Sequence, residues 1–341
     1  MAIPNQKEIF GKNEDIFTDI IGQDEAKAQV KSALIMGRHI IIAGQPGTGK
    51  TTLAKNVAKI LPEIEVNECE YNCDRNSPAC PVCKTKSPGL KKISGRERFV
   101  RIQGSPDLTV EDILGDIDPV KALKFGPLSV EAFTPGKIFR ANNGVLFFDE
   151  VNRCSEKLQN ALLQILQEGV ATIGSYYVDF PAKFIFIGTM NPEDTATEPL
   201  SSVFLDRFDL VYMGYPLKNE DETEIVKKYG NQLELAFEEN LLSLVILFVR
   251  LLRESDKLQK HPGVRASIGL YERAQANAYL KGRKSVAFED IRDAVVSVLS
   301  HRIELKPSVK YLQSQEDFIA KEFNDFVRQN PEFEEYKGDG L

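Results

Sequence analysis

The sequence lacks any apolar run that is long enough to cross a bilayer. Its longest run, LLSLVILFV at 241–249, is followed directly by Arg250, whereas a membrane-spanning helix needs about 20 apolar residues. The first fourteen residues are polar and do not resemble a secretory signal peptide. We therefore expect a cytoplasmic protein that does not insert into membranes.

The sequence also lacks an excess of positive charge. Its 341 residues include 43 Lys and Arg against 50 Asp and Glu, which gives a net charge of −7. Because phosphate contacts dominate the affinity of proteins for nucleic acids, this balance argues against a general nucleic-acid binder, although a local basic patch stays possible. There are no internal repeats or low-complexity tracts, so the length predicts about two ordinary globular domains.

Apolar segments that alternate with helical patterns predict a parallel α/β sheet in the first part of the chain. From Lys218 onward, apolar residues recur only at three- and four-residue spacing, which predicts helices. We therefore expect an α/β core over residues 1–216 and an all-helical second domain over 217–341. The strand candidates are HIIIA (39–43), RFVRIQG (98–104), GVLFFDE (144–150), KFIFIGTMN (183–191) and DLVYMGY (209–215).

The segment GQPGTGKT, residues 44–51, has the composition of a phosphate-binding loop. It follows the first strand candidate and precedes a helix that we predict from Thr51 to about Ile60. Its glycines let the backbone wrap around phosphate, Lys50 supplies positive charge to the β- and γ-phosphates, and the Thr51 hydroxyl ligates Mg²⁺. The alternative is a chance glycine-rich turn. The residues expected to bind nucleotide here are Gly44, Gln45, Pro46, Gly47, Thr48, Gly49, Lys50, Thr51 and Thr52.

Two adjacent acidic residues, Asp149 and Glu150, follow the third strand candidate. The preceding run, Val145 to Phe148, is continuously apolar, as in a strand buried on both faces. Carboxylates that crown such a strand are costly without a cation, so we expect Asp149 to bind Mg²⁺, directly or through water. Glu150 would then polarise the attacking water. A buried structural acid pair is the alternative interpretation.

Four of the five cysteines, Cys69, Cys73, Cys80 and Cys83, lie within fifteen residues. Disulfides are not expected in a cytoplasmic chain. The CPVC spacing is that of a zinc knuckle, and four thiolates would complete a tetrahedral, structural zinc site with no open position. A reduced, metal-free loop or a redox cluster is the alternative. We expect the fifth cysteine, Cys154, simply to be packed.

Three more polar residues stand where a nucleotide-dependent switch needs them. Asn191 ends the fourth strand candidate and could contact the γ-phosphate or position the lytic water. Arg207, in LDRFD, precedes a strand, and Arg265, in GVRAS, begins a helix of the second domain. For each arginine, helix capping or a surface ion pair is the alternative role.

The order of the motifs GQPGTGKT, FFDEVNR, GTMNP, LDRFD and GVRAS resembles that of AAA+ ATPases, and more narrowly the clade of MoxR proteins and the magnesium chelatase I subunit. The resemblance covers nearly the whole chain. RIQGSPDLTVEDILGDID and FTPGKIF look most like MoxR, whereas CEYNCDRNSPACPVC and GTMNPED are more similar to the chelatase side. It implies a P-loop NTPase core and a helical lid, with a Cys-rich insertion at 66–98, a helix-two insert at 109–136 and a pre-sensor-one hairpin at 169–182.

The resemblance also implies a role for individual residues. Asn191 would be sensor one, Arg265 would be sensor two, and Arg207 would be an arginine finger that acts in trans on the nucleotide of a neighbouring subunit. Gln103 could hold Glu150 inactive until a partner binds. The residues that would border the adenine are Ile20, Ile21 and Gly22. The candidates for gripping a client from the two inserts are Leu128, Phe133, Tyr176 and Tyr177, although buried packing is the more common fate of such residues.

The implied function is that of a MoxR-like ATPase with ATP and Mg²⁺ as cofactors. It would form a ring, expected to be hexameric, that remodels, activates or inserts metal into a client complex, together with a partner carrying a von Willebrand factor A domain. One alternative is a magnesium chelatase I-type subunit. Another is a nucleic-acid motor related to replicative helicases, although the hairpin at 169–182 has no cluster of Lys and Arg. A GTPase is excluded because there is no Asn-Lys-x-Asp motif.

Overall fold

All five strand candidates form strands of one parallel sheet. The strand order is β11-β1-β10-β7-β4, and each neighbouring pair is parallel. The predicted α/β class with a parallel sheet is therefore confirmed. The strands are β1 (His39–Ala43), β4 (Phe99–Gln103), β7 (Val145–Asp149), β10 (Ile185–Met190) and β11 (Phe208–Tyr212).

The computed structural model describes residues 5–11, 15–76, 78, 80, 83–84, 88–127, 129–173, 178–192 and 200–334. The chain divides into two compact units. The first comprises Met1–Gln45 and Gly49–Met213, and the second comprises Pro46–Thr48 and Gly214–Leu341. No helix in these described ranges is both long and apolar enough to cross a membrane.

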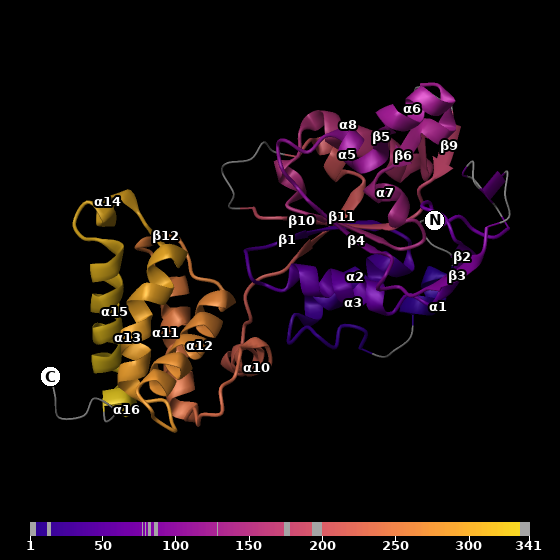
Figure 1. Cartoon of the computed structure of the whole chain (residues 1–341). Coiled ribbons are helices and arrows are strands. Elements are labelled where there is room, and N and C mark those ends of the chain that lie inside the picture. The colour runs from indigo at the N-terminus through magenta and orange to yellow at the C-terminus, as the bar shows by residue number, and fades with distance from the viewer. Residues whose placement is uncertain are drawn as a thin grey trace. The chain divides into compact units, whose positions relative to one another are not determined.

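Helices cover both faces of the sheet in the first unit (Figure 1). Successive strand residues face opposite sides, because side chains alternate along a strand. In β7, Val145 and Phe147 pack in the cluster that includes α3, whereas Leu146 and Phe148 pack in the cluster that includes α8. Asp149 continues this alternation on the α3 side. The helices of the first layer are α1 (Gln6–Phe10), α2 (Asp24–Ile35) and α3 (Lys50–Lys59), and those of the second include α5 (Val110–Leu114), α7 (Lys137–Arg140) and α8 (Glu156–Glu168).

Three antiparallel strand pairs of the first unit are separate from the parallel sheet. One frames the cysteine segment, one lies in the insert at 109–136, and one forms the two strands of the hairpin predicted at 169–182. The pairs are β2 (Ile64–Asn67) with β3 (Leu90–Ile93), β5 (Gly115–Ile117) with β6 (Phe133–Pro135), and β8 (Val170–Ile173) with β9 (Val178–Pro181). The short elements that remain are α6 (Pro119–Phe125), η1 (Val130–Ala132), η2 (Val151–Arg153) and α9 (Ser202–Leu205).

The second unit is built from helices, as their apolar spacing predicts. Their apolar faces form a separate core, in which Leu244, Phe248, Leu270 and Phe318 are fully buried. A small antiparallel pair, β12 (Leu258–Lys260) with β13 (Glu304–Leu305), was not predicted, because two or three residues give no periodic signal. The helices are α10 (Asn219–Tyr229), α11 (Glu239–Glu254), α12 (Val264–Leu280), α13 (Phe288–Leu299), η3 (Ser300–Arg302), α14 (Pro307–Lys310), α15 (Gln315–Gln329) and α16 (Pro331–Glu334).

Candidate functional site

The segment at 44–51 has the strand–loop–helix arrangement that a phosphate-binding loop requires. It connects β1 to α3, whose first residue is Lys50. Gly47 and Gly49 have φ angles of 85° and 96°, a left-handed conformation that glycine adopts at little cost. The Lys50 ammonium donates to the carbonyl oxygens of Gly44 at 2.6 Å and Gln45 at 2.7 Å, so it lies inside the curve of the loop.

The acid pair lies at the same edge of the sheet as this loop. Strands β1, β10 and β7 are adjacent and parallel, so their carboxyl ends meet at one edge. Asp149 ends β7, and Asn191 directly follows the last residue of β10. Asp149 also lies on the face that α3 covers. The arrangement therefore gathers the loop, the two acids and Asn191 at one end of the sheet, as the sequence predicts for a nucleotide site.

Thr189 connects the two strands through hydrogen bonds that the sequence analysis missed. Its hydroxyl donates to Oδ1 of Asp149 at 2.6 Å and accepts from the backbone N–H of Glu150 at 2.9 Å. The side chain is fully buried. A hydroxyl two residues before Asn191 on an otherwise apolar strand is a signal that could have pointed to it. Thr189 thus fixes where both acidic residues stand.

Glu150 has an uncommon backbone conformation for a residue with a side chain. Its φ and ψ angles are 55° and 51°, and such conformations concentrate at functional sites. Gln103 donates to Oε2 of Glu150 at 2.9 Å, and Nη1 of Arg153 lies 3.2 Å from the same oxygen. Gly104, which follows Gln103, lets the two backbones lie close together, because a Cβ there would come within 2.1 Å of the carbonyl oxygen of Glu150.

Among the residues predicted to border an adenine, Ile20 lies beside the end of the phosphate-binding loop. It is buried in the apolar cluster under α3, and a Cβ built on Gly49 would lie 3.3 Å from its Cδ1 atom. Ile21 is half-buried, and Gly22 has a φ angle of 62°. The segment therefore lies close to the end of the loop, while its contact with adenine stays a prediction.

Arg207 lies at the opposite edge of the sheet from the acid pair. It directly precedes β11, whose Phe208 pairs with His39 at the start of β1. A strand of five residues spans about 16 Å, so Arg207 is separated by that length from the carboxyl ends of the strands. Its Nη1 atom lies 2.8 Å from Oδ2 of Asp206, which is itself exposed. The fold thus keeps Arg207 away from the carboxyl ends of the strands, where the acid pair lies.

Arg207 is one of the residues that line a pocket of about 310 Å³. Burial lowers the pKa of His39 to about 4, so the ring is neutral at physiological pH, and its Nδ1 accepts from the backbone N–H of Phe186 at 3.1 Å. Arg38 also lines the pocket and pairs with Asp209 at 2.9 Å. The exposed side of Arg207 therefore faces a polar recess rather than the apolar core.

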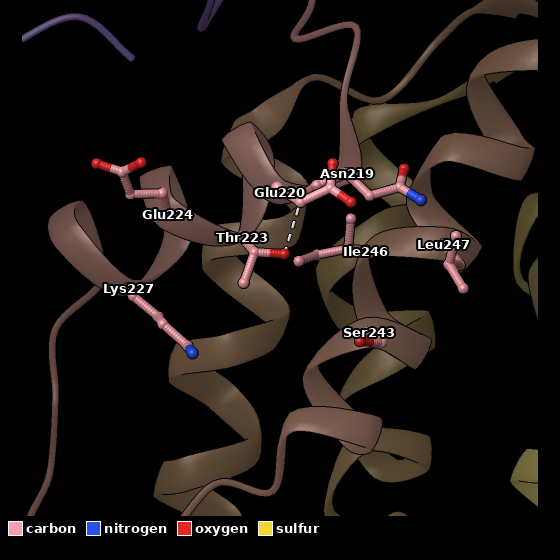
Figure 2. Close-up of a pocket in the computed structure, with 8 residues that line it drawn as sticks. All are labelled: Asn219, Glu220, Thr223, Glu224, Lys227, Ser243, Ile246 and Leu247. Atoms are coloured by element: carbon pink, nitrogen blue, oxygen red, sulfur yellow. Dashed lines mark hydrogen bonds between the residues drawn. The ribbon is translucent and has the colours of Figure 1, made fainter. Parts of the chain in front are cut away.

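Arg265 lies in the second unit as the second residue of α12, and its side chain is exposed. A separate pocket of about 500 Å³ lies between α10 and α11 of that unit (Figure 2). Two of the side chains that line it are acidic, Glu220 and Glu224, and one is basic, Lys227. None of the residues predicted to bind nucleotide lines it, and its charge does not favour phosphate.

The four clustered cysteines come together in space. Their Sγ atoms all lie within 4.8 Å of one another, and three of the side chains are buried. The backbone N–H of Cys73 donates to Sγ of Cys69 at 3.4 Å, and that of Cys83 donates to Sγ of Cys80 at 3.4 Å. Hydrogen bonds from Cys73 and Cys80 hold the pKa of Cys69 well below its usual range. The donor set fits a soft tetrahedral metal ion.

Two other sequence expectations have clear outcomes. Cys154 is buried, as predicted. The gripping role suggested for Phe133 is wrong, and the alternative of buried packing is what the structure shows: the side chain is only 5% exposed and stacks on Phe180 with ring centroids 6.3 Å apart. An aromatic ring within reach of a buried aromatic cluster gains more by packing than by exposure. The other three residues proposed for this role, Leu128, Tyr176 and Tyr177, lie outside the described residues.

Three protein families match consecutive parts of the chain. The ATPase family associated with various cellular activities (AAA) matches residues 82–210, and the AAA lid domain matches residues 260–322. The magnesium chelatase subunit ChlI family matches residues 16–82, which include the phosphate-binding loop.

Relatives of known name match over most of the chain. A magnesium-chelatase subunit ChlI homolog of Methanocaldococcus jannaschii is 31% identical and covers 92% of both chains. The magnesium-chelatase 38 kDa subunit of Acidiphilium rubrum is 30% identical over 85% of this chain and 91% of its own. Among solved structures, the P216G mutant of Thermotoga maritima RuvB has a TM-score of 0.51 at 15% identity, over 93% of this chain and 91% of that chain. The last likeness concerns the fold alone.

We predict that Thr189→Val lowers the free energy of unfolding by about 1–3 kcal/mol. Valine keeps the shape but leaves the buried N–H of Glu150 and one oxygen of Asp149 without their partner. Urea titration measures the change. The matched control is Thr134→Val in the same unit, where the lost hydroxyl is exposed and accepts a long hydrogen bond of 3.3 Å from Lys121, so the change should stay within about 0.5 kcal/mol. Equal changes in the two variants would contradict the connecting role of Thr189.

Proposed function

We propose that this chain, which belongs to the magnesium-chelatase ChlI family of AAA+ ATPases, uses ATP hydrolysis in a ring of identical subunits to remodel, activate or insert metal into a client complex. ATP and Mg²⁺ are the cofactors that an AAA+ ATPase implies. The ring is inferred from the position of Arg207, which lies at the opposite end of the strands from Asp149 and Glu150.

In the proposed site, each group acts on a different part of the nucleotide. The loop at 44–52 surrounds the phosphates and Lys50 neutralises their charge. The Thr51 hydroxyl and the Asp149 carboxylate offer the oxygen ligands that Mg²⁺ prefers, which supports their assignment to the metal. Glu150 accepts a hydrogen bond from the attacking water, and Asn191 orients that water or the γ-phosphate. Ile20, Ile21 and Gly22 border the adenine.

Gln103 is proposed to hold Glu150 in an inactive position. Its 2.9 Å hydrogen bond to Oε2 of Glu150 supports this assignment, because it engages one of the two carboxylate oxygens that could accept from water and fixes the orientation of the side chain. Gln103 ends β4, and the chain continues from there into the insert at 109–136. A client or partner that moves the insert would therefore release Glu150.

Arg207 is proposed to act as an arginine finger on the nucleotide of the next subunit. The separation of about 16 Å along β11 exceeds the reach of an arginine side chain, which supports action in trans. Such a contact requires a head-to-tail interface, and repetition of that interface closes a ring, which we propose to be a hexamer. Arg265 is proposed as sensor two in a helical lid over 217–341, which follows a core over 1–216.

The client side of the proposal has two versions. MoxR-like motifs such as RIQGSPDLTVEDILGDID support a chaperone-like role with a partner that carries a von Willebrand factor A domain. Identity of 30–31% to magnesium-chelatase subunits over most of the chain supports the second version, a chelatase I-type subunit that works with other subunits on a porphyrin. A nucleic-acid motor has less support, since the net charge is −7.

The cysteine cluster is proposed to hold one structural Zn²⁺ through Cys69, Cys73, Cys80 and Cys83. The mutual approach of the Sγ atoms within 4.8 Å supports a four-thiolate site with no open position. The ring of Tyr71, between the first two ligands, stacks on Phe180 of β9 at 5.0 Å. The metal would therefore stabilise the surface against which the hairpin packs.

We predict that Arg207→Ala still binds ATP but hydrolyses it about a thousandfold more slowly. Lys50→Ala should not bind ATP, yet it keeps Arg207. If the finger acts in trans, an equal mixture of the two inactive variants regains activity at about a quarter of its interfaces, since random assembly pairs an intact site with an intact finger that often. ATPase assays on the mixture measure this recovery.

The control for this mixture is Arg207→Ala combined with a double variant, Lys50→Ala with Arg207→Ala. No intact finger is then present, so no recovery is expected. If the first mixture stays as inactive as this control although the variants assemble together, Arg207 does not act across subunits.

We also predict that protein purified with reductant and without chelator contains about one zinc per chain. Cys80→Ser should lose most of the metal, because three thiolates hold zinc far less tightly than four. Cys154→Ser, a buried cysteine outside the cluster, is the matched control and should retain it. Elemental analysis measures the metal, and a wild-type protein free of zinc would contradict the site.

A further inference from the structure

Arg101 contacts the acid pair in a way that none of the nucleotide-binding motifs requires. Its Nη2 atom donates to Oδ2 of Asp149 at 2.6 Å. Arg101 and Gln103 occupy alternate positions of β4, and Gln103 pairs in register with Asp149. Both side chains therefore stand on one face of the sheet beside the carboxyl end of β7.

Each oxygen of the carboxylate accepts a hydrogen bond. Oδ1 of Asp149 accepts from Thr189, and Oδ2 accepts from Arg101. The Asp149 side chain is 16% exposed, whereas that of Arg101 is 52% exposed. The two donors to Asp149 therefore differ in freedom. Thr189 is a fully buried donor on a strand, whereas Arg101 has a long side chain that can turn towards solvent.

This difference has a consequence for a metal at Asp149. A divalent cation that binds the carboxylate directly needs one of its two oxygens, and a cation that binds through water needs the same oxygen as a hydrogen-bond acceptor. Displacing Thr189 would strand buried polar groups, whereas displacing Arg101 returns a charged group to water. Oδ2, which accepts from Arg101, is therefore the oxygen that can lose its donor and become available to the cation.

We propose that Arg101 is a displaceable counter-ion, which balances the charge of Asp149 and competes with Mg²⁺ for its Oδ2 atom. The inference rests on the proposed role of Asp149 as the magnesium-binding residue. Gln103 offers the displaced guanidinium its nearest other acceptor, since Oε1 lies 3.4 Å from the same Nη2 atom. Binding of the metal would thus shift Arg101 towards Gln103, whose amide holds Glu150. Arg101 is a positioning residue in this scheme.

A purely structural role explains the contact less well. β4 and β7 are already joined by a complete ladder from Phe99 to Gln103, and the N–H of Gly104 extends it to the carbonyl oxygen of Asp149 at 2.7 Å. An ion pair with one partner half exposed adds little to such a ladder. Neutralising a mostly buried carboxylate is the larger effect.

The test is the affinity of the ADP-bound, full-length protein for Mn²⁺, used as a reporter for Mg²⁺ and measured by electron paramagnetic resonance of the free ion. Arg101→Gln removes the competitor and should bind Mn²⁺ about three- to fivefold more tightly than wild type. Arg101→Lys keeps a weaker contact and should fall between the two. Thermal unfolding of each variant checks that it is folded.

Arg153→Gln is the matched control, since it removes the same charge beside the same site but from Glu150. Its Mn²⁺ affinity should change by less than about twofold. An Arg101→Gln variant with unchanged or weaker Mn²⁺ binding would overturn the proposal, and so would an equal gain in Arg153→Gln, because the effect would then be one of general charge.

A double variant separates this inference from the proposed function. Asp149→Asn should weaken Mn²⁺ binding, and adding Arg101→Gln to it should give no further gain, because the competition has no target. If Asp149→Asn leaves the affinity unchanged, the metal-binding role of Asp149 itself is wrong. If it weakens binding while Arg101→Gln on its own gives no gain, only the counter-ion role is wrong.

Discussion

The parallel direction of the five-stranded sheet is the constraint on which the rest of the structure depends. It brings the carboxyl ends of β1, β10 and β7 to one edge, so residues far apart in sequence, such as Lys50, Asp149 and Asn191, share a site. The same constraint sends Arg207, which precedes β11, to the other edge. One topological fact therefore both gathers these residues and keeps Arg207 apart from them, which is the basis of the proposal that another subunit supplies the arginine.

The balance of charge at the carboxyl ends of the strands is a second constraint. Two adjacent carboxylates follow a continuous apolar run, and each is held by groups from neighbouring elements. Asp149 is held by Thr189 and Arg101, and Glu150 is held by Gln103 and Arg153. Because these partners come from β10, β4 and η2, a movement of any one element alters the acids.

Much of the fold and of the site could be predicted from the sequence. The five strands, the loop at 44–51 and the acid pair have local signals: apolar runs, glycine spacing and a lysine before a helix. The approach of the four cysteines followed from their spacing, and it is present in the structure. These features depend on residues that lie close together along the chain.

The remaining features depend on contacts between distant segments. Thr189 and Arg101 reach Asp149 only because β10 and β4 flank β7. The order of strands in a sheet cannot be predicted from the periodicity of any one strand. Whether Phe133 grips a client or packs could not be decided from the sequence for a related reason. Phe139 lies nearby in the sequence, but Phe180, which stacks on Phe133, comes from the distant strand β9. β12 and β13 are too short to give a pattern at all.

The claim that tests this account most directly is that a single chain holds an incomplete catalytic site. Light scattering with a non-hydrolysable ATP analogue, combined with the ATPase rate per subunit across a range of protein concentrations, measures it. We predict a rise to about six times the mass of one chain, and a rate per subunit that increases cooperatively over the same range. A monomer whose turnover per chain is rapid and independent of concentration would contradict the shared site.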